Sequence, residues 1–384
     1  MLGLVQDLCN MNSGTFNLQG LDRVKQRLVE EFTSLGGEIK LLDSNPMSVV
    51  DESGNEVQQQ LGQMIHVSKR LKAKKKVLLC IHMDTVYAAE HSFQKCKTLD
   101  NGHVNGPGVA DAKGGIVVML WALKTLEASP LAGKIGWEVL LNADEEIGSP
   151  GSIEFIKQVA GRCDVGLLYE PALPDGTLVS WRKGSGNFSF VVRGKAAHAG
   201  REFDKGRNAI VAVSRLIDEI ANLNTDPDVT YNAGRISGGG ALNVVPDLAI
   251  GRVNVRVKTV QQQAEVETKF EQLVDKFNQL DGISVKQFGG FTSPPKPLCG
   301  ETEKLQQRIE AAGEALSLPV AWRGTGGASD GNKFAAAGLP NVDTLGPLGG
   351  AIHSSDEYLI PDSLVDRAKL SALILLSLAT EAGG

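Results

Sequence analysis

Five short groups of histidine and carboxylate residues each follow an apolar run of this 384-residue chain. The groups are His82 with Asp84, Asp111, Glu145 with Glu146, Glu170, and His353. In open α/β sheets, ligands bind at the carboxyl ends of the strands. The sequence therefore predicts an α/β sheet with a polar site along one edge.

The first half of the chain alternates compact apolar runs with amphipathic segments. The pattern predicts buried strands at 77–81, 135–143 and 165–169, and a helix at 114–128 with Val117, Leu120 and Leu123 on one side. This alternation indicates a sheet that is flanked by helices.

The pattern changes in the middle of the chain. It predicts strands at 188–193, 231–236, 249–257 and 283–288 and helices at 207–221 and 260–280, which suit a small α+β sandwich. After the proline-rich segment 293–297 the α/β pattern resumes and ends in a helix at 362–382. We therefore expect one domain from residues 1–183 and 296–384, with residues 184–295 inserted as a second domain whose two linkers form a hinge.

Composition narrows the function classes. The 39 Lys and Arg against 45 Asp and Glu give a net charge of −6, which argues against a nucleic-acid partner. No apolar segment approaches the roughly 18 residues of a membrane span. Five cysteines, an odd number without a CxxC pair, favour free thiols in a reducing compartment. A cytoplasmic location without membrane contact is expected, with a signal peptide removed beforehand as the alternative.

Several candidate ligands could also have purely structural roles. His66, His91 and His103 are interpreted as core or surface histidines, whereas His82 has Asp84 two residues later, on the same side of an extended backbone. Such a carboxylate fixes the orientation of a metal-bound imidazole. Asp111 precedes the predicted helix 114–128, so it either caps that helix or bridges two cations between the flanking glycines.

Glu145 and Glu146 are adjacent, so their side chains diverge. One is expected to bind metal while the other faces the reactive water as a general base, because placing two carboxylates at a buried strand end is otherwise costly. The alternative is an exposed acidic turn before Gly148. Glu170 follows the strand predicted at 165–169 and completes the acidic set.

Taken together, the motifs resemble a known family. The segments HMDTV, GPGVADAKGG, ADEEIGSPGS, LYEP, GKAAHAG, NVVPDLAIGRVNVR, GTGGASDG and LGPLGGAIHSSDEYL are similar, in order and over nearly the whole chain, to the M20 metallopeptidases. The likeness is strongest to the glutamate carboxypeptidase branch, which is related to acetylornithine deacetylase and succinyl-diaminopimelate desuccinylase. The resemblance implies a catalytic zinc-peptidase domain with a mixed sheet flanked by helices, and an inserted α+β sandwich that serves as lid and dimerisation domain.

The resemblance also implies a role for each candidate residue. His82 and Glu170 would bind one Zn²⁺, Glu146 and His353 the other, and Asp111 would bridge them, with Co²⁺ or Mn²⁺ as substitutes. Glu145 would be the general base and Asp84 would orient His82.

Four further residues are implied to contact the substrate. His198 would stabilise the oxyanion, from the partner subunit in dimeric members, and Asn243 would hydrogen-bond the substrate or the oxyanion. Arg256 would bind the free α-carboxylate, and the loop at Gly327 would supply backbone donors.

The expected function is hydrolysis of an amide or peptide bond next to a free C-terminal α-carboxylate, as in a glutamate carboxypeptidase. The expected partners are a small peptide or N-acyl amino acid substrate and a second copy bound through the inserted domain. The alternatives are an N-acyl-amino-acid deacylase or a dipeptidase, a non-enzymatic binding protein, and a metal-dependent phosphoesterase. An intact set of ligands disfavours the binding protein, and few basic residues near the motifs disfavour the phosphoesterase.

Overall fold

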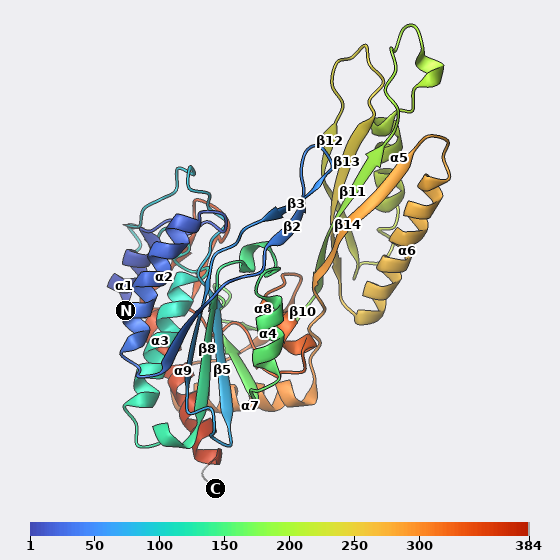
Figure 1. The fold of residues 1–384 in the computed structure, drawn as a ribbon. Helices are drawn as coiled ribbons and strands as arrows, with labels where there is room; N and C mark the ends of the chain where they lie inside the picture. The colour runs from blue at the N-terminus through green and yellow to red at the C-terminus, as the bar shows by residue number, and fades with distance from the viewer. Residues whose placement is uncertain (383–384) are drawn as a thin grey trace.

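The computed structural model describes residues 1–382, which form two lobes (Figure 1). The larger lobe is built from both ends of the chain and the smaller lobe from its middle. This arrangement confirms the predicted fold class, an α/β domain with a second α+β domain inserted into it. Across the described residues, none of the helices combines the length and the apolar character that a membrane crossing needs.

A six-stranded mixed sheet forms the centre of the larger lobe. Its strands, in spatial order, are β1 (Glu38–Leu42), β4 (Met64–Lys69), β8 (Gly136–Asn142), β5 (Lys76–His82), β9 (Val165–Leu168) and β16 (Asn341–Val342). The last four run parallel to one another, and β4 runs antiparallel to both of its neighbours, β1 and β8. The carboxyl ends of β8, β5 and β9 therefore meet at one edge of the sheet, as the sequence pattern predicts.

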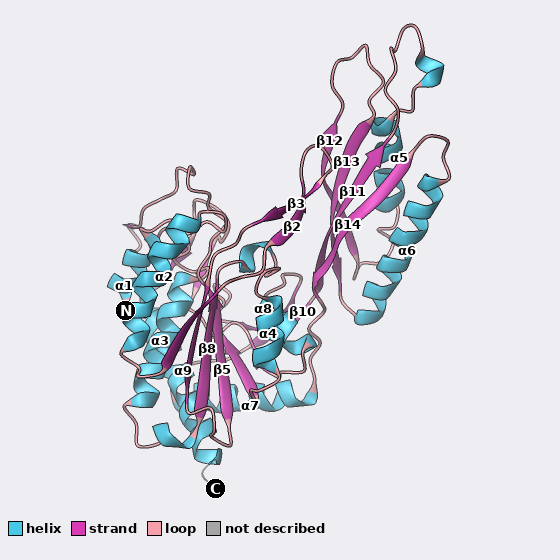
Figure 2. Ribbon diagram, in the orientation of Figure 1, coloured by secondary structure: helices cyan, strands magenta, loops and turns pink. Residues whose placement is uncertain are grey.

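Helices cover both faces of this sheet (Figure 2). One face packs against α1 (Leu2–Cys9), α2 (Leu18–Thr33), α3 (Lys113–Glu127), α7 (Gly300–Ala315) and α9 (Pro361–Ala382), and the other against α4 (Ile153–Ala160) and α8 (Asp330–Ala336). On β5, Val77, Leu79 and Ile81 join the first core and Leu78 and Cys80 the second. Because a strand buried on both faces has no polar side, it reads as a continuous apolar run.

Short elements complete the larger lobe. They are the hairpin β2 (Met47–Val50) and β3 (Glu56–Gln59), the parallel pair β10 (Leu178–Arg182) and β15 (Trp322–Thr325), and the small sheet of β6 (Lys97–Thr98), β7 (Val104–Asn105), β18 (Tyr358–Leu359) and β17 (Gly349–Gly350). Single 3₁₀ turns lie at Ala132–Lys134 and Glu145–Ile147 of the larger lobe, and a third lies at Phe203–Lys205 of the smaller lobe. The small sheet ties the loop before α3 to the segment that follows β17.

The smaller lobe is an antiparallel sheet with two helices on one face. Its elements are β11 (Gly184–Arg193), α5 (Ala209–Ala221), β12 (Thr230–Gly238), β13 (Leu248–Val257), α6 (Val260–Asn278) and β14 (Ser284–Ser293), with the strand order β12-β13-β11-β14. The insert predicted at 184–295 thus begins with β11 and ends two residues after β14. Phe188 and Phe190 meet Phe270 of α6 edge to face in its core.

The predicted ends of two strands in this lobe were wrong. The sequence pattern places these two strands at 188–193 and 283–288, where large apolar residues recur. In the structure β11 already begins at Gly184 and β14 continues to Ser293, because backbone hydrogen bonding continues through small and polar residues. The pattern of apolar side chains gives no sign of backbone pairing between residues of this kind.

The β2–β3 hairpin of the larger lobe reaches the sheet of the smaller lobe on the face opposite its helices. Arg193 Nη2 donates to the carbonyl oxygens of Ser53 at 3.1 Å and Gly54 at 3.2 Å, and Arg252 Nη2 donates to that of Val50 at 3.3 Å. The polar face of β13, which carries Arg252, therefore has a partner inside the chain rather than solvent alone. The lobes touch through this hairpin as well as through the two linkers.

Glu138 on β8 provides a test of a buried ionic contact outside the candidate site. It accepts hydrogen bonds from His66 at 2.7 Å and Arg162 at 2.7 Å. Burial acts to raise the pKa of Glu138, but the hydrogen bonds from His66 and Arg162 outweigh it and lower this pKa to about 2, from an ordinary 4.5. We expect Glu138→Gln to lower the free energy of unfolding of this lobe by about 2 kcal/mol at pH 7.

Because the folded pKa is depressed, the stabilisation is complete above about pH 5 and is lost as the pH falls towards 2. Urea denaturation of the parent and of Glu138→Gln should therefore show a difference at pH 7 that shrinks by pH 3. Glu154→Gln, on the exposed side of α4, is the matched control and should change little at either pH. An equal difference at both pH values would contradict an ionised Glu138.

Candidate metal centre and substrate cleft

The five predicted metal ligands converge at the carboxyl edge of the central sheet. His82 ends β5, Glu146 lies in the 3₁₀ turn after β8, and Glu170 follows β9 by two residues. Asp111 lies in the loop before α3, and His353 lies between β17 and β18 with a φ of 62°. A left-handed backbone is uncommon for a residue other than glycine and is often found at functional sites. The sheet thus gathers residues that are up to 271 positions apart in sequence.

Asp111 lies between the two histidines. Its Oδ1 is 3.1 Å from Nε2 of His82, and its Oδ2 is 3.2 Å from Nε2 of His353. Glu170 approaches the same nitrogen of His82 at 3.6 Å, and Glu146 approaches that of His353 at 3.2 Å. The five side chains therefore form two groups of three donors that share one carboxylate. The N-cap of α3 is Ala112 and no side chain caps it, so Asp111 does not act as a helix cap.

The electrostatics of this centre favour bound cations. Burial, and then the charge of Glu170, raise the pKa of Glu145 well above its usual value, and burial, and then Asp111, raise the pKa of Glu146 to about 7. Hydrogen bonds with Asp111 and Glu146 raise the pKa of His353 to about 11. The carboxylates of Asp111, Glu145, Glu146 and Glu170 share one buried space, so this space attracts positive charge. The raised pKa values of Glu145, Glu146 and His353 express that attraction. Divalent ions fit this donor set of imidazole nitrogens and carboxylate oxygens.

Asp84 contacts both His82 and the turn that carries Glu145 and Glu146. Nδ1 of His82 donates to the backbone oxygen of Asp84 at 3.0 Å, with the carboxylate oxygen Oδ1 at 3.3 Å. Because a carbonyl oxygen can only accept, Nδ1 carries a proton, which leaves Nε2, the nitrogen that faces Asp111, as the one that can bind a metal ion. The Asp84 carboxylate also accepts the backbone N–H groups of Glu145 at 3.2 Å and Glu146 at 3.3 Å, and the hydroxyl of Thr15 at 2.7 Å.

Glu357 positions the Asp111 loop, and the sequence pattern does not single it out. Its buried carboxylate accepts the backbone N–H groups of Gly108 at 3.0 Å, Ala110 at 3.0 Å and Asp111 at 3.1 Å, and the hydroxyl of Tyr87 at 2.8 Å. The signal that the sequence offers for Glu357 is its place in the HSSDEY segment, four residues after the predicted ligand His353.

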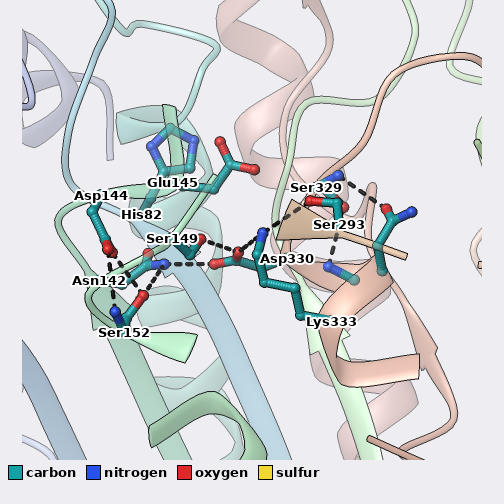
Figure 3. Close-up of polar contacts among 12 residues, drawn as sticks. His82, Asn142, Asp144, Glu145, Ser149, Ser152, Ser293, Ser329, Asp330 and Lys333 are labelled. Atoms are coloured by element: carbon teal, nitrogen blue, oxygen red, sulfur yellow. Dashed lines mark hydrogen bonds and ion pairs between the residues drawn. The ribbon is translucent and has the colours of Figure 1, made fainter. Parts of the chain in front are cut away.

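A buried polar network fixes the turn that carries Glu145 (Figure 3). Asp330, at the start of α8, accepts from Asn142 at 2.5 Å and from Ser149, and it pairs with Lys333 at 3.0 Å. Asp144 accepts the backbone N–H of Gly151 at 2.7 Å, within the same turn. Both ends of the turn are thereby attached to the lobe, so Glu145 is held at the edge of the sheet beside His82.

A cleft of about 430 Å³ opens over the centre between the two lobes. Its walls include Asp111, Glu145 and His353 from the larger lobe and Arg256 from β13. Arg256 donates from Nε to Asn254 at 3.0 Å and from Nη1 to the carbonyl oxygen of Gly326 at 3.4 Å. Gly327 lines the same cleft, and its own N–H donates to Thr325 at 3.3 Å.

His198 and Asn243 do not line this cleft. Both are exposed, and their loops pair with each other, with the N–H of Ala199 donating to the carbonyl oxygen of Asn243 at 2.9 Å. These loops, 194–208 and 239–247, lie at the end of the smaller lobe that is farther from the larger one (Figure 1). Within one chain, Arg256 and Gly327 therefore line the cleft, whereas His198 and Asn243 lie far from it.

The other three histidines considered lie outside the centre. His66 pairs with Glu138, His91 Nδ1 accepts the N–H of Phe93, and His103 stacks on Tyr358. These contacts agree with the interpretation of all three as structural or surface groups.

Comparison with known proteins shows which family the chain resembles. Residues 78–377 match the family model described as "Peptidase family M20/M25/M40". Carboxypeptidase G2 of Pseudomonas sp. (strain RS-16) is 27% identical over 97% of this chain and 88% of its own length. A succinyl-diaminopimelate desuccinylase of Nitrosospira multiformis is 26% identical over 72% of this chain and 75% of its own length.

The fold is shared with solved structures as well. A tripeptidase from Staphylococcus aureus superposes with a TM-score of 0.75 at 22% identity, covering 99% of this chain and 98% of its own. The relatives identify the chain as a hydrolase, and its family is metal-dependent. Because the family match spans well over half of the sequence, the protein belongs to the peptidase family M20/M25/M40.

Proposed function

We propose that the protein is a dizinc hydrolase that cleaves an amide or peptide bond next to a free C-terminal α-carboxylate, in the manner of a glutamate carboxypeptidase. The observation that carries this proposal is the cleft that joins Glu145 and the shared carboxylate Asp111 to Arg256. Reacting groups and a carboxylate-binding guanidinium then face one substrate from two sides.

His82, Asp111 and Glu170 would hold one Zn²⁺, and His353, Asp111 and Glu146 the other. Bound there, the two ions would polarise the substrate carbonyl and lower the pKa of water to about 7. Glu145 takes the proton of that water and returns it to the leaving nitrogen. Asp84 keeps the turn of Glu145 and the ring of His82 in fixed relation, since it binds both.

His198 and Asn243 are assigned to the cleft of a second copy. Three observations support a homodimer through the smaller lobe: both residues lie outside their own cleft, β12 is an exposed edge strand, and Phe203, Leu242 and Val244 are exposed on the same loops. Exposed apolar groups of this kind mark protein contacts.

An N-acyl-amino-acid deacylase remains the second candidate, because the desuccinylase relative covers most of the chain. Both reactions cleave an amide beside a free α-carboxylate. A screen of the zinc-loaded protein on dipeptides and on N-acetyl and N-succinyl amino acids separates them by the acyl group that is preferred.

Arg256→Met tests the proposed contact between Arg256 and the α-carboxylate of the substrate. We expect kcat/KM on substrates with a free α-carboxylate to fall about 100-fold, mainly through KM, because a partly buried ionic contact is lost. Amidated substrates should be poor for the parent and equally poor for the variant. Arg323→Met, on the exposed side of β15, is the control and should keep parental kinetics. Hydrolysis of amidated and free substrates at equal rates by the parent would contradict the proposal.

A further inference from the structure

The β2–β3 hairpin of the larger lobe ends against the sheet of the smaller lobe (Figure 1). Its tip is a tight turn in which the carboxylate of Asp51 accepts the backbone N–H groups of Ser53 at 2.9 Å and Asn55 at 2.8 Å. At Gly54, whose φ is 72°, an added Cβ would lie 2.8 Å from Cγ1 of Val191 in β11. The tip therefore has a fixed shape and packs directly on the smaller lobe.

Three arginines of the smaller lobe bind this tip. Arg252 Nη2 lies 3.3 Å from Oε1 of Glu52, and Arg235 Nη2 lies 3.2 Å from the same oxygen. Arg193 Nη2 donates to the carbonyl oxygen of Gly54 at 3.2 Å. The side chains of Glu52 and Arg235 are each 59% exposed, so their ion pair alone stabilises the contact little. The contact consists of several weak bonds, so single substitutions can release it without unfolding either lobe.

The base of the hairpin is attached to the turn that carries Glu145. The hairpin lies in the chain between β1 and β4, which pair in the central sheet. Ser44 Oγ donates to the carbonyl oxygen of Gly62 at 2.6 Å and closes the base. The N–H of Asn45 donates to the carbonyl oxygen of Gly151 at 3.0 Å, and the N–H of Gly151 is itself bound within the turn after β8. The base is therefore fixed relative to the metal centre.

The tip binds the strand that carries Arg256. Residues two apart on a strand point to the same face, so Arg252, Asn254 and Arg256 share one face of β13. Four residues of a strand span about 13 Å, which is the separation along β13 between the hairpin contact at Arg252 and Arg256. Asn254, between them, accepts from Nε of Arg256 at 3.0 Å. The hairpin thus joins the metal centre to the strand of the proposed carboxylate ligand.

The two linkers alone would leave the smaller lobe free to rotate. They lie side by side, because the N–H and C=O of Arg182 exchange hydrogen bonds of 3.0 Å with Lys296, and so they define a single axis. Rotation about such an axis changes the width of the cleft between two lobes. The hairpin binds at Arg193, the last residue of β11, whereas the linker enters this strand at Gly184, the first. A third attachment far from the axis opposes the rotation.

We propose that the β2–β3 hairpin is a spacer that sets the distance between the metal centre and Arg256, with Glu52 and Gly54 as positioning residues. This inference rests on the proposed function, in which Arg256 binds the α-carboxylate of the leaving residue. A fixed distance suits a leaving residue whose carboxylate is one carbon from the scissile nitrogen, as in an α-amino acid. A β-amino acid adds one carbon and displaces that carboxylate.

Pulsed electron paramagnetic resonance tests the spacer without catalysis. Nitroxides on p-acetylphenylalanine, introduced at the exposed positions Lys157 of α4 and Lys269 of α6, report the distance between the lobes and avoid the native cysteines. Dilution with unlabelled protein restricts the signal to distances within one chain. We expect a narrow distribution in the parent and a broad one in two variants. Glu52→Arg repels Arg252, and Gly54→Val pushes the tip away from β11.

A charge swap shows whether the contact itself matters. Glu52→Arg combined with Arg252→Glu again sets one carboxylate between two guanidinium groups, because Arg235 remains. This double variant should recover the narrow distribution. Glu38→Arg, an exposed charge reversal on β1, is the control and should resemble the parent. Thermal unfolding and zinc content show that each variant is folded.

Kinetics on matched leaving residues test what the spacing does. On acetyl-Ala-Ala against acetyl-Ala-β-alanine, we expect kcat/KM of the parent to favour the α-amino acid by about 100-fold, the cost of a displacement of about 1 Å. In Glu52→Arg and Gly54→Val this preference should fall to about 10-fold, with KM on the α-substrate raised about fivefold, because the cleft must then be ordered on binding. The turnover number kcat should stay near the parental value, and the charge swap should recover both the preference and KM.

An unchanged distance distribution in both variants would overturn the spacer. A broad distribution with the parental preference for the α-amino acid would overturn the role of Glu52 and Gly54 in positioning Arg256. Failure of the parent on every substrate with a free α-carboxylate would instead count against the proposed function. The resonance experiment alone would then decide whether the hairpin fixes the distance between the lobes.

Discussion

Glu145→Gln should lower kcat by about 10³-fold while the protein keeps the metal ions proposed for this centre. The amide occupies the same space but cannot accept the proton of the attacking water. Both carboxylates line the cleft, but Glu146 is the one that pairs with His353, so the loss of the Glu145 carboxylate should affect proton transfer rather than metal binding. Steady-state kinetics, with the metal content of the same samples measured by mass spectrometry, check this result.

Two further variants serve as controls for this prediction. Glu146→Gln removes a proposed ligand, so it should lose metal as well as activity, and Glu154→Gln on the outer side of α4 should change neither. Parental turnover by a metal-loaded Glu145→Gln enzyme would show that another group takes the proton.

The sequence predicts the fold best where burial is two-sided. β5, β8 and β9 are apolar along their whole length, so their pattern stands out, and the return of the α/β pattern after 301 reveals the insertion. β1 has mostly exposed side chains at the sheet edge and gives no such signal. For α2 a signal did exist, since Leu21, Val24, Leu28 and Phe32 recur at helical spacing.

In the candidate site too, the sequence predicts some residues and misses others. Its proposed ligands could be predicted because a histidine or carboxylate at the end of a buried strand is costly unless it binds a partner. Thr15 and Glu357 are also buried against these residues, but their contacts depend on the folded loops. Arg182, a buried residue that lines the cleft, could not be recognised either, because its partner Asp343 and Lys296, which shares that partner, lie more than a hundred residues away in the chain.

His198→Ala should lower kcat by about 10²-fold, as the removal of an oxyanion donor does, although His198 lies outside the cleft of its own chain. If the donor comes from the partner, the defects of His198→Ala and Glu145→Gln lie in different subunits of a mixed dimer. One of its two sites then combines an intact Glu145 with an intact His198. Subunit exchange in an equal mixture should therefore restore about one quarter of the parental activity.

The alternative is that the tip of the smaller lobe bends back over its own cleft. Each chain would then need both residues, so mixing two inactive variants would restore nothing. Leu242→Asp distinguishes dimer loss from catalytic loss, because it places a charge at a fully exposed apolar position beside Asn243. We expect it to yield monomers by sedimentation with the low turnover of His198→Ala. Monomers with parental turnover would remove the partner's histidine from the reaction, since an isolated chain would then suffice.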